Sequence, residues 1–347
     1  MYGVNRGSTQ PTRALRLAAP LLFFLLLPGC KRPPSTTEQR VDPRLASSIS
    51  TALTSPSPMV GSLPLRSPVS LTRVYKARGN RPGWIAGTCP SARAVELIRA
   101  LMAAGDHGLR PSDYPVVEIN ALQDEARLEG CKEGRWPLTR AADMELLLSD
   151  AMLLFATHLA SGRLHQEDLT PRRAASPGGP AEAALARILG GGRLVEQLSD
   201  IPPRAAGYAS LVGTNRILRD AAAQGGWPTI PEGEELRMGA QGPRVAALGQ
   251  RLRAAGFPVS AGKTTYGRAV EVAVEAFQER AGLEMTGVVD AETLARLNSP
   301  VDEHLDRIAL NLERWRWLPQ DLGPLVVLVN IPGQRVRLLS RGSEALI

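Results

Sequence analysis

Cysteine, serine and histidine side chains are the groups through which this 347-residue chain could carry out acyl transfer. Such a reaction needs a nucleophile, a neighbouring base and a site that stabilises the developing oxyanion. Ser260 and Lys263 have a Ser-x-x-Lys spacing, in which a lysine can activate a serine. They fall in a predicted loop between two short helices, whereas that motif needs the serine at the start of a helix beneath a large sheet. We therefore predict no catalysis at this pair.

Two cysteines, Cys89 and Cys131, lie in the body of the chain, and neither has the Gly-rich surroundings or the nearby histidine expected of a nucleophile. Each lies in a loop-like stretch that contains Gly or Pro, close to a predicted helical segment. The sequence leaves two interpretations open: a disulfide between them, or two unpaired, partly buried thiols. No residue is assigned a catalytic role.

The chain has four histidines, and their spacing does not match that of metal ligands. They are His107, His158, His165 and His304. We interpret them as surface or helix-packing residues, and we predict neither a metal nor a cofactor.

The N-terminal 30 residues have the regions of an export signal. Arg6, Arg13 and Arg16 are positive, and 17–28 is an apolar stretch too short to span a membrane. The stretch ends in Leu-Pro-Gly-Cys30, which resembles the bacterial lipobox, although the proline replaces the usual small residue. The resemblance implies that Cys30 is acylated and holds the protein on a membrane of the cell envelope, in the periplasm. An ordinary cleaved signal with an incidental cysteine is the alternative.

The formal net charge of +7 suggests an acidic partner at first sight. Only four of the 41 basic residues are lysines, and the arginines are scattered through the sequence rather than clustered. Residues 1–29 carry three arginines and no acid, so removal of the signal lowers the charge to +4 (7 − 3). Because nucleic-acid binding needs clustered charge with interleaved aromatic residues, we predict no nucleic-acid partner.

Composition and periodicity divide the rest of the chain. Residues 31–68 are rich in Ser, Thr, Pro and Arg with little periodic apolar pattern, which predicts a flexible tether. Strand signals are almost absent between there and residue 324, so the fold class is mainly α. Apolar residues at helical spacing predict helices at 92–104, 139–161, 181–189, 192–199 and 206–224.

A pattern of three short helices occupies 236–299. Residues 244–255 and 267–280 place apolar side chains on one face, and Asp290 precedes the third helix as an N-cap. The pattern resembles the peptidoglycan-binding module shared by many wall enzymes, except at Gly249, where that family more often has glutamine. The residues that carry the resemblance are Gly239, Gly242, Val245, Leu248, Leu252, Gly256, Ala273, Val274, Phe277, Gln278, Gly282, Leu283, Thr286, Gly287, Thr293 and Leu294.

The resemblance implies that peptidoglycan is the partner of this module. Four polar residues near its predicted core are candidates to face a wall ligand: Arg244, Gln250, Gln278 and Thr293. For Gln278 and Thr293 it is equally open that they satisfy backbone groups inside so small a domain. Trp315 and Trp317, further along the chain, could stack on sugar, but their pattern favours packing of a helix against its neighbours.

The sequence on both sides of the module resembles the large L,D-transpeptidases, which cross-link peptidoglycan. The resemblance rests on Val74-Tyr75, Arg78, Pro82-Gly-Trp84, 104–114, 143–148, 158–163, Gly226-Trp-Pro228, 307–319 and 326–332. It implies a helical scaffold domain at 69–232, and at 300–347 a linker helix with the first β-strands of a catalytic domain. In that family the catalytic domain continues with a histidine and a Ser-x-Gly-Cys segment. Because this chain has no such segment, we expect a truncated, non-catalytic protein.

Our leading hypothesis is a membrane-anchored scaffold that binds peptidoglycan for cross-linking of the cell wall. An enzymatic alternative makes the sequence a piece of an active transpeptidase that joins diaminopimelate residues through a cysteine thioester. In a third hypothesis the protein is an accessory subunit of a wall hydrolase, because the binding module also occurs beside amidases and carboxypeptidases. The resemblance of the first half to a transpeptidase scaffold argues against the third.

Overall fold

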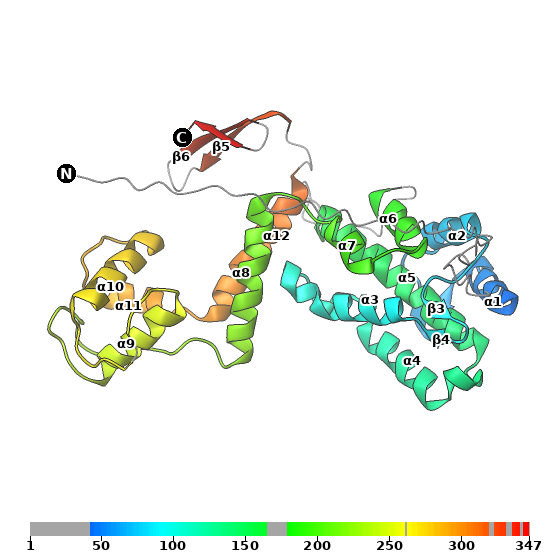
Figure 1. Ribbon diagram of the computed structural model, residues 1–347, viewed down its shortest axis with the longest axis horizontal. Coiled ribbons are helices and arrows are strands. Elements are labelled where there is room, and N and C mark those ends of the chain that lie inside the picture. Colours follow the sequence, from blue (N-terminus) through cyan, green and yellow to red (C-terminus); the bar gives the residue numbers. More distant parts are fainter. Residues whose placement is uncertain are drawn as a thin grey trace, which may run out of the picture. The chain divides into compact units, whose positions relative to one another are not determined.

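The computed structural model describes residues 42–164, 179–260, 262–318, 323–330, 335–340 and 343–346 (Figure 1). Its α-helices are α1 (Pro43–Thr54), α2 (Pro68–Ala77), α3 (Ala92–Met102), α4 (Val116–Leu128), α5 (Leu138–Ser161), α6 (Pro180–Leu189), α7 (Leu194–Ser199), α8 (Ala206–Ala223), α9 (Pro243–Ala254), α10 (Arg268–Ala281), α11 (Ala291–Leu297) and α12 (Val301–Trp317). Short 3-10 helices lie at Ala103–His107, Pro111–Asp113 and Cys131–Glu133.

The strands are short and all pair antiparallel. They are β1 (Met59–Val60), β2 (Leu63–Pro64), β3 (Ile85–Ala86), β4 (Cys89–Pro90), β5 (Leu325–Asn330), β6 (Arg335–Ser340) and β7 (Ser343–Leu346). β1 pairs with β2, β3 with β4, and β6 lies between β5 and β7. The predicted mainly α fold class is confirmed.

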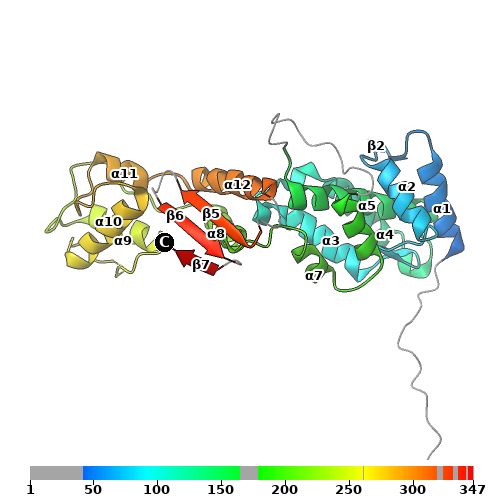
Figure 2. The same ribbon diagram turned by 90° about the horizontal axis from the view of Figure 1, so that it is seen from above.

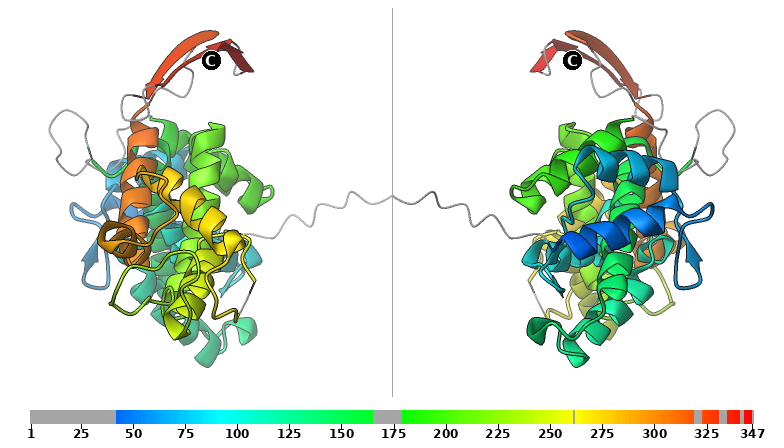
Figure 3. Two further views of the ribbon diagram at one scale, coloured as in Figure 1. Left: turned by 90° about the vertical axis from the view of Figure 1, so that its left-hand side faces the viewer. Right: turned by 90° about the vertical axis from the view of Figure 1, so that its right-hand side faces the viewer.

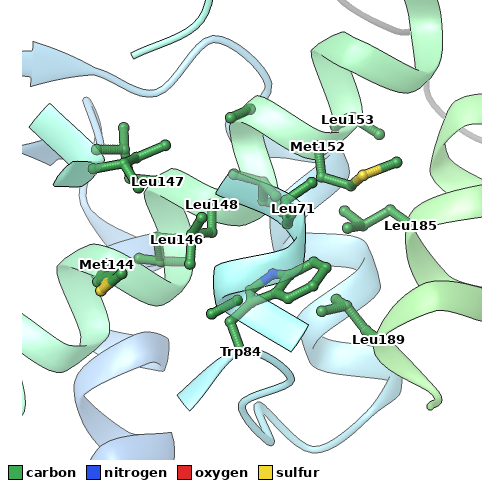
Figure 4. Packing of buried hydrophobic residues seen from close by; sticks show 14 of the residues in the cluster. Leu71, Trp84, Met144, Leu146, Leu147, Leu148, Met152, Leu153, Leu185 and Leu189 are labelled. Atoms are coloured by element: carbon green, nitrogen blue, oxygen red, sulfur yellow. The ribbon is translucent and has the colours of Figure 1, made fainter. Parts of the chain in front are cut away.

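Helix α5 forms the centre of the first hydrophobic core. Its side chains are buried on nearly all sides because α1, α2, α4 and α6 pack around it. Figure 4 shows Leu71 of α2, Trp84, and Leu185 and Leu189 of α6 gathered around the α5 side chains. Within the described ranges, α5 is the one helix long and apolar enough to cross a membrane, but 89% of its most apolar window is buried inside the protein. It is therefore the core helix of this domain.

The prediction of a flexible tether is wrong from residue 43 onward. Helix α1 begins after Asp42, whose carboxylate accepts a hydrogen bond from the Arg44 amide, and it packs on α5 (Figure 3). Leu45, Ile49 and Leu53 are buried there at every fourth position, which is one face of a helix. Ser and Thr fill the positions between them and hid this stripe. The remainder of the predicted tether, 31–41, lies outside the described residues.

The predicted helices before residue 225 correspond to α3, α5, α6, α7 and α8, with ends within two residues of those expected. The sequence did not predict α2 or α4. Helix α4 buries Ile119, Leu122 and Ala126, a narrow stripe that polar residues interrupt. Such a stripe is enough to cover one side of α3 and α5 but gives a weak periodic signal.

Helices α8 and α12 lie side by side and share a small core of their own (Figures 1 and 2). Tyr208 and Leu312 are fully buried between them. The helices meet closely at Gly207, where an added Cβ would lie 2.6 Å from an atom of the Trp315 ring. The Trp317 indole donates to Glu313 at 3.3 Å within α12. Both tryptophans thus contribute to the packing and hydrogen bonding of α12, as the pattern favoured.

One face of the strands in the last described segment is apolar and exposed. Leu325, Val327 and Val329 of β5 alternate on one side of the sheet, at 62%, 59% and 62% exposure. Val336 of β6, which pairs with Val329, adds to the same face. An exposed apolar row of this kind favours association with another surface.

Candidate functional site

Helices α9, α10 and α11 enclose a second hydrophobic core, which is made by residues between 230 and 297. Its fully buried side chains are Val245, Leu248, Leu252, Tyr266, Val274 and Leu297. The chain enters α9 through Gly242 at φ 120°, a conformation that glycine adopts without strain. Asp290 caps α11, because its carboxylate accepts from the Thr293 amide at 2.8 Å. The start of α9 and the start of α11 therefore each have a local cause in the sequence.

Gln278 and Thr293 lie inside this module rather than on its surface, each at 1% exposure. The Gln278 amide nitrogen donates to Thr293 Oγ1 at 3.1 Å and to the Val288 carbonyl at 2.9 Å. Its oxygen accepts from the Gly287 amide at 3.0 Å. The two side chains hold the turn before α11. Neither is placed to face a wall ligand, because a module of this size must satisfy the polar groups of its turns internally.

Arg244 and Gln250, the other two candidates, take no part in that network. The Arg244 guanidinium donates to the carbonyls of Pro231 and Glu234, at 2.9 Å and 2.6 Å. It therefore ties down the segment that enters the module. Gln250 lies exposed on α9. Of the four candidates, Gln250 alone presents an exposed side chain.

A cavity of about 380 Å³ lies at the edge of the module, between the end of α8 and the start of α12. Its walls include Trp227, Arg251, Asn298, Ser299 and Val301. Asn298 forms paired hydrogen bonds with the Ile230 backbone, accepting from the amide and donating to the carbonyl at 2.9 Å each. These bonds join the segment before the module to the end of α11.

Arg251 is the charged group of this cavity, and it is only 2% exposed. Its Nε donates to the Leu297 carbonyl at 2.5 Å, and its guanidinium carbon lies 4.1 Å from the centroid of the Trp227 ring. Its Nη1 is buried without a hydrogen-bond partner. Burial lowers the pKa of Arg251 to about 10, with no contribution from an acid, so the group stays positive at neutral pH.

Arg251 is not among the residues that the sequence predicted to face a ligand. Its position on α9 could have indicated that it is buried. It follows Leu248 by three residues and precedes Leu252, so it lies at the margin of the buried face. A charged residue at such a position needs a compensating partner in the protein or in a ligand, because burial of an unpaired charge is costly. The Trp227 ring also contacts the ring of His304, at 4.9 Å between centroids, and burial lowers the pKa of that histidine.

Cys89 and Cys131 form a disulfide, with Cα atoms 5.1 Å apart. The bond joins β4 to the 3-10 helix after α4, and Thr88 Oγ1 donates to the Cys131 carbonyl at 2.5 Å. Of the two interpretations left open by the sequence, the structure has the bonded pair, and neither sulfur is a free thiolate. Cys30 lies outside the described residues.

Two histidines lie beside tyrosines outside the module, with His158 buried and His107 partly buried. His107 Nδ1 lies 3.0 Å from Tyr208 Oη, and His158 Nδ1 lies 3.0 Å from Tyr114 Oη. Burial lowers the pKa of both histidines to about 4. In the part of the chain that the structure describes, no group of three or more His, Cys, Asp or Glu side chains could hold a metal.

Comparison with known families places two models on the chain. A model described as a scaffold domain matches residues 69–214, and a model described as a putative peptidoglycan binding domain matches residues 241–297. No curated protein matches the chain. The two models support a peptidoglycan-related protein with a peptidoglycan-binding role, and the second falls on the module formed by α9, α10 and α11.

Proposed function

We propose that this chain is the membrane-anchored, peptidoglycan-binding scaffold part of an L,D-transpeptidase-family protein involved in cell-wall cross-linking. The observation that carries the proposal is that the match at 241–297 falls on a module with a hydrophobic core of its own. The scaffold match at 69–214 falls largely on the first core. The two matches support a wall-binding unit joined to a helical framework.

The scaffold domain, in this proposal, extends from residue 42 to 232, because α1 belongs to its core. The module occupies 236–299, and 300–347 contains the linker helix and the strands that begin the next domain. The helices next to the module are tied to the scaffold through α12. Glu313 accepts from the amides of Arg163 and Leu164, at 2.6 Å and 3.0 Å, just beyond the end of α5.

Arg316 completes this connection. It is 3% exposed, it forms an ion pair with Glu313 at 3.0 Å, and it donates to the Tyr208 hydroxyl of α8 at 3.1 Å. It also donates to the His107 carbonyl. Both members of this ion pair lie on α12, so the hydrogen bonds of Arg316 to Tyr208 and to the His107 carbonyl are what fix α12 to α8 and the scaffold. A fixed junction of this kind suits a scaffold that must hold a wall-binding module in place.

Wall binding is tested by co-sedimentation of the full chain with purified peptidoglycan sacculi. The matched variants are Val274→Asp and Val272→Asp, two valines of α10 with exposures of 0% and 46%. Asp at 274 puts an unpaired carboxylate into the module core, which a core of this size cannot tolerate. We expect Val274→Asp to lose sedimentation and Val272→Asp to retain that of the natural protein.

Circular dichroism of both variants serves as the control, because the scaffold helices should survive either change. Sedimentation of Val274→Asp at the level of the natural protein would place the wall-binding site outside the module. If neither variant loses sedimentation, wall binding does not depend on the module. If the natural protein itself does not sediment, the proposed function is removed altogether.

The membrane anchor rests on Leu-Pro-Gly-Cys30 at the end of the apolar N-terminal stretch. Because acyl chains on Cys30 would hold the protein on a membrane, a fatty-acid probe fed to cells should label the natural protein and not Cys30→Ala. Equal labelling of the two proteins would remove the anchor and leave an ordinary cleaved signal.

The proposal assigns no catalytic step to the residues described here. Acyl transfer through a thioester needs a free thiolate. Cys89 and Cys131 are bonded to each other, and neither sulfur can attack a peptide while that bond lasts. A disulfide of this kind also fits export, because such bonds persist in oxidising compartments such as the periplasm.

A further inference from the structure

The cavity beside Arg251 has the features of a binding site for an anion. A guanidinium that is 2% exposed normally has an acid partner, because an unpaired buried charge is costly. Arg251 has none: its Nε bonds to a carbonyl, its Nη1 is unpartnered, and a tryptophan ring covers one face. The arginine lines a cavity of about 380 Å³, within the range of small-ligand sites.

The other residues that line the cavity indicate what kind of anion it could bind. Trp227, Pro228 and Val301 provide apolar walls, and Asn298 and Ser299 provide polar groups beside them. The cavity lies at the start of α12, where the helix dipole adds positive potential. Asp302 opposes it at the rim, but that side chain is exposed and its charge is screened by water. A small apolar group that carries one carboxylate suits this lining.

We propose that this cavity is a subsite for a free carboxylate of a peptidoglycan stem peptide. The inference rests on the proposed wall-binding function and adds to it the part of the polymer that is recognised. Stem peptides end in a carboxylate next to a small apolar side chain, which matches a guanidinium beside apolar walls. Planar N–H donors of arginine suit a carboxylate better than a sugar hydroxyl, because both the charge and the geometry are complementary.

The experiment measures calorimetric binding of the full chain to a stem tetrapeptide with free carboxylates, and to the same peptide with its carboxylates amidated. We expect the amidated peptide to bind at least about tenfold more weakly, because charge-assisted hydrogen bonds are lost. Added salt should lower the affinity for the free peptide more than the affinity for the amidated one. Equal affinities, or no measurable binding of the free peptide, would overturn the proposal.

Substitutions in α8 test whether the carboxylate binds in this cavity, and they leave Arg251 unchanged. Ala222 lines the cavity, whereas the neighbouring Ala223 is exposed and does not. Ala222→Trp should fill the cavity and lower the affinity for the free peptide at least about tenfold. Ala223→Trp should leave that affinity unchanged. Arg251→Lys keeps the charge but loses the planar donors, so we expect an intermediate loss of affinity for the free peptide. Equal affinity of the two tryptophan variants would place the carboxylate elsewhere.

Sedimentation with sacculi separates failure of this inference from failure of the proposed function. A full chain that sediments with sacculi but shows no dependence on the carboxylate keeps its wall-binding role and loses this subsite. A full chain that does not sediment loses both.

Discussion

Glu145→Ala is expected to unfold the scaffold domain or to lower its melting temperature by more than about 10 °C. The Glu145 carboxylate is 0% exposed and accepts from the Tyr75 hydroxyl at 2.6 Å. It also accepts from the amides of Gly83, Trp84 and Ile85, at 2.6 Å, 2.8 Å and 3.0 Å. Burial raises the pKa of Glu145, and these hydrogen bonds oppose the rise.

The size of the effect follows from the groups that alanine would leave behind. Each buried donor without a partner costs about 1–3 kcal/mol, and three amides would lose theirs at once. The total is comparable with the whole stability of a typical domain, about 5–15 kcal/mol. Thermal unfolding followed by circular dichroism measures the change, with Glu118→Ala on the exposed side of α4 as the control. A Glu145→Ala protein that melts within about 2 °C of the natural one would show that the amides find other partners.

Removal of the disulfide is expected to have the second largest effect. Cys89 and Cys131 are separated by 42 residues, and a cross-link across that distance removes about 4 kcal/mol of loop-closure entropy from the unfolded chain. We expect the double variant Cys89→Ser and Cys131→Ser to unfold at a lower denaturant concentration, with a loss of about 2–5 kcal/mol.

A reducing agent provides the control for this prediction. It should lower the unfolding midpoint of the natural protein and leave that of the double variant unchanged, because the variant has no bond to break. Identical midpoints for the natural and variant proteins would show that the bond adds nothing to stability.

The sequence predicted elements well where their causes are local. The three helices of the module follow from apolar spacing, a glycine before α9 and the Asp290 cap, and each lies where it was expected. The resemblance of Pro82-Gly-Trp84 to a transpeptidase scaffold acquires a physical reason in the structure. An added Cβ at Gly83 would lie 2.4 Å from Leu189 Cδ2, so glycine lets this loop approach α6 and bring its amides to Glu145.

Elements that depend on distant contacts could not be read from the sequence. Helix α1 looked like a tether because its Ser and Thr content outweighed three apolar residues, and the surface of α5 that they cover is remote in sequence. In the same way, the sequence left open whether Gln278 faces a ligand or satisfies internal polar groups, because its four polar partners come together only in the folded module. Arg251 became a candidate only because the segment around Trp227 folds over it.

Sedimentation of two separate parts of the chain with purified sacculi shows which part binds the wall. One fragment covers the module, 229–300, and the other covers the scaffold before it, 42–224. Each has its own hydrophobic core, and circular dichroism checks that each is folded. We expect the module fragment to sediment with sacculi and the scaffold fragment to stay in solution. Sedimentation of a folded scaffold fragment, with the folded module fragment left in solution, would contradict it.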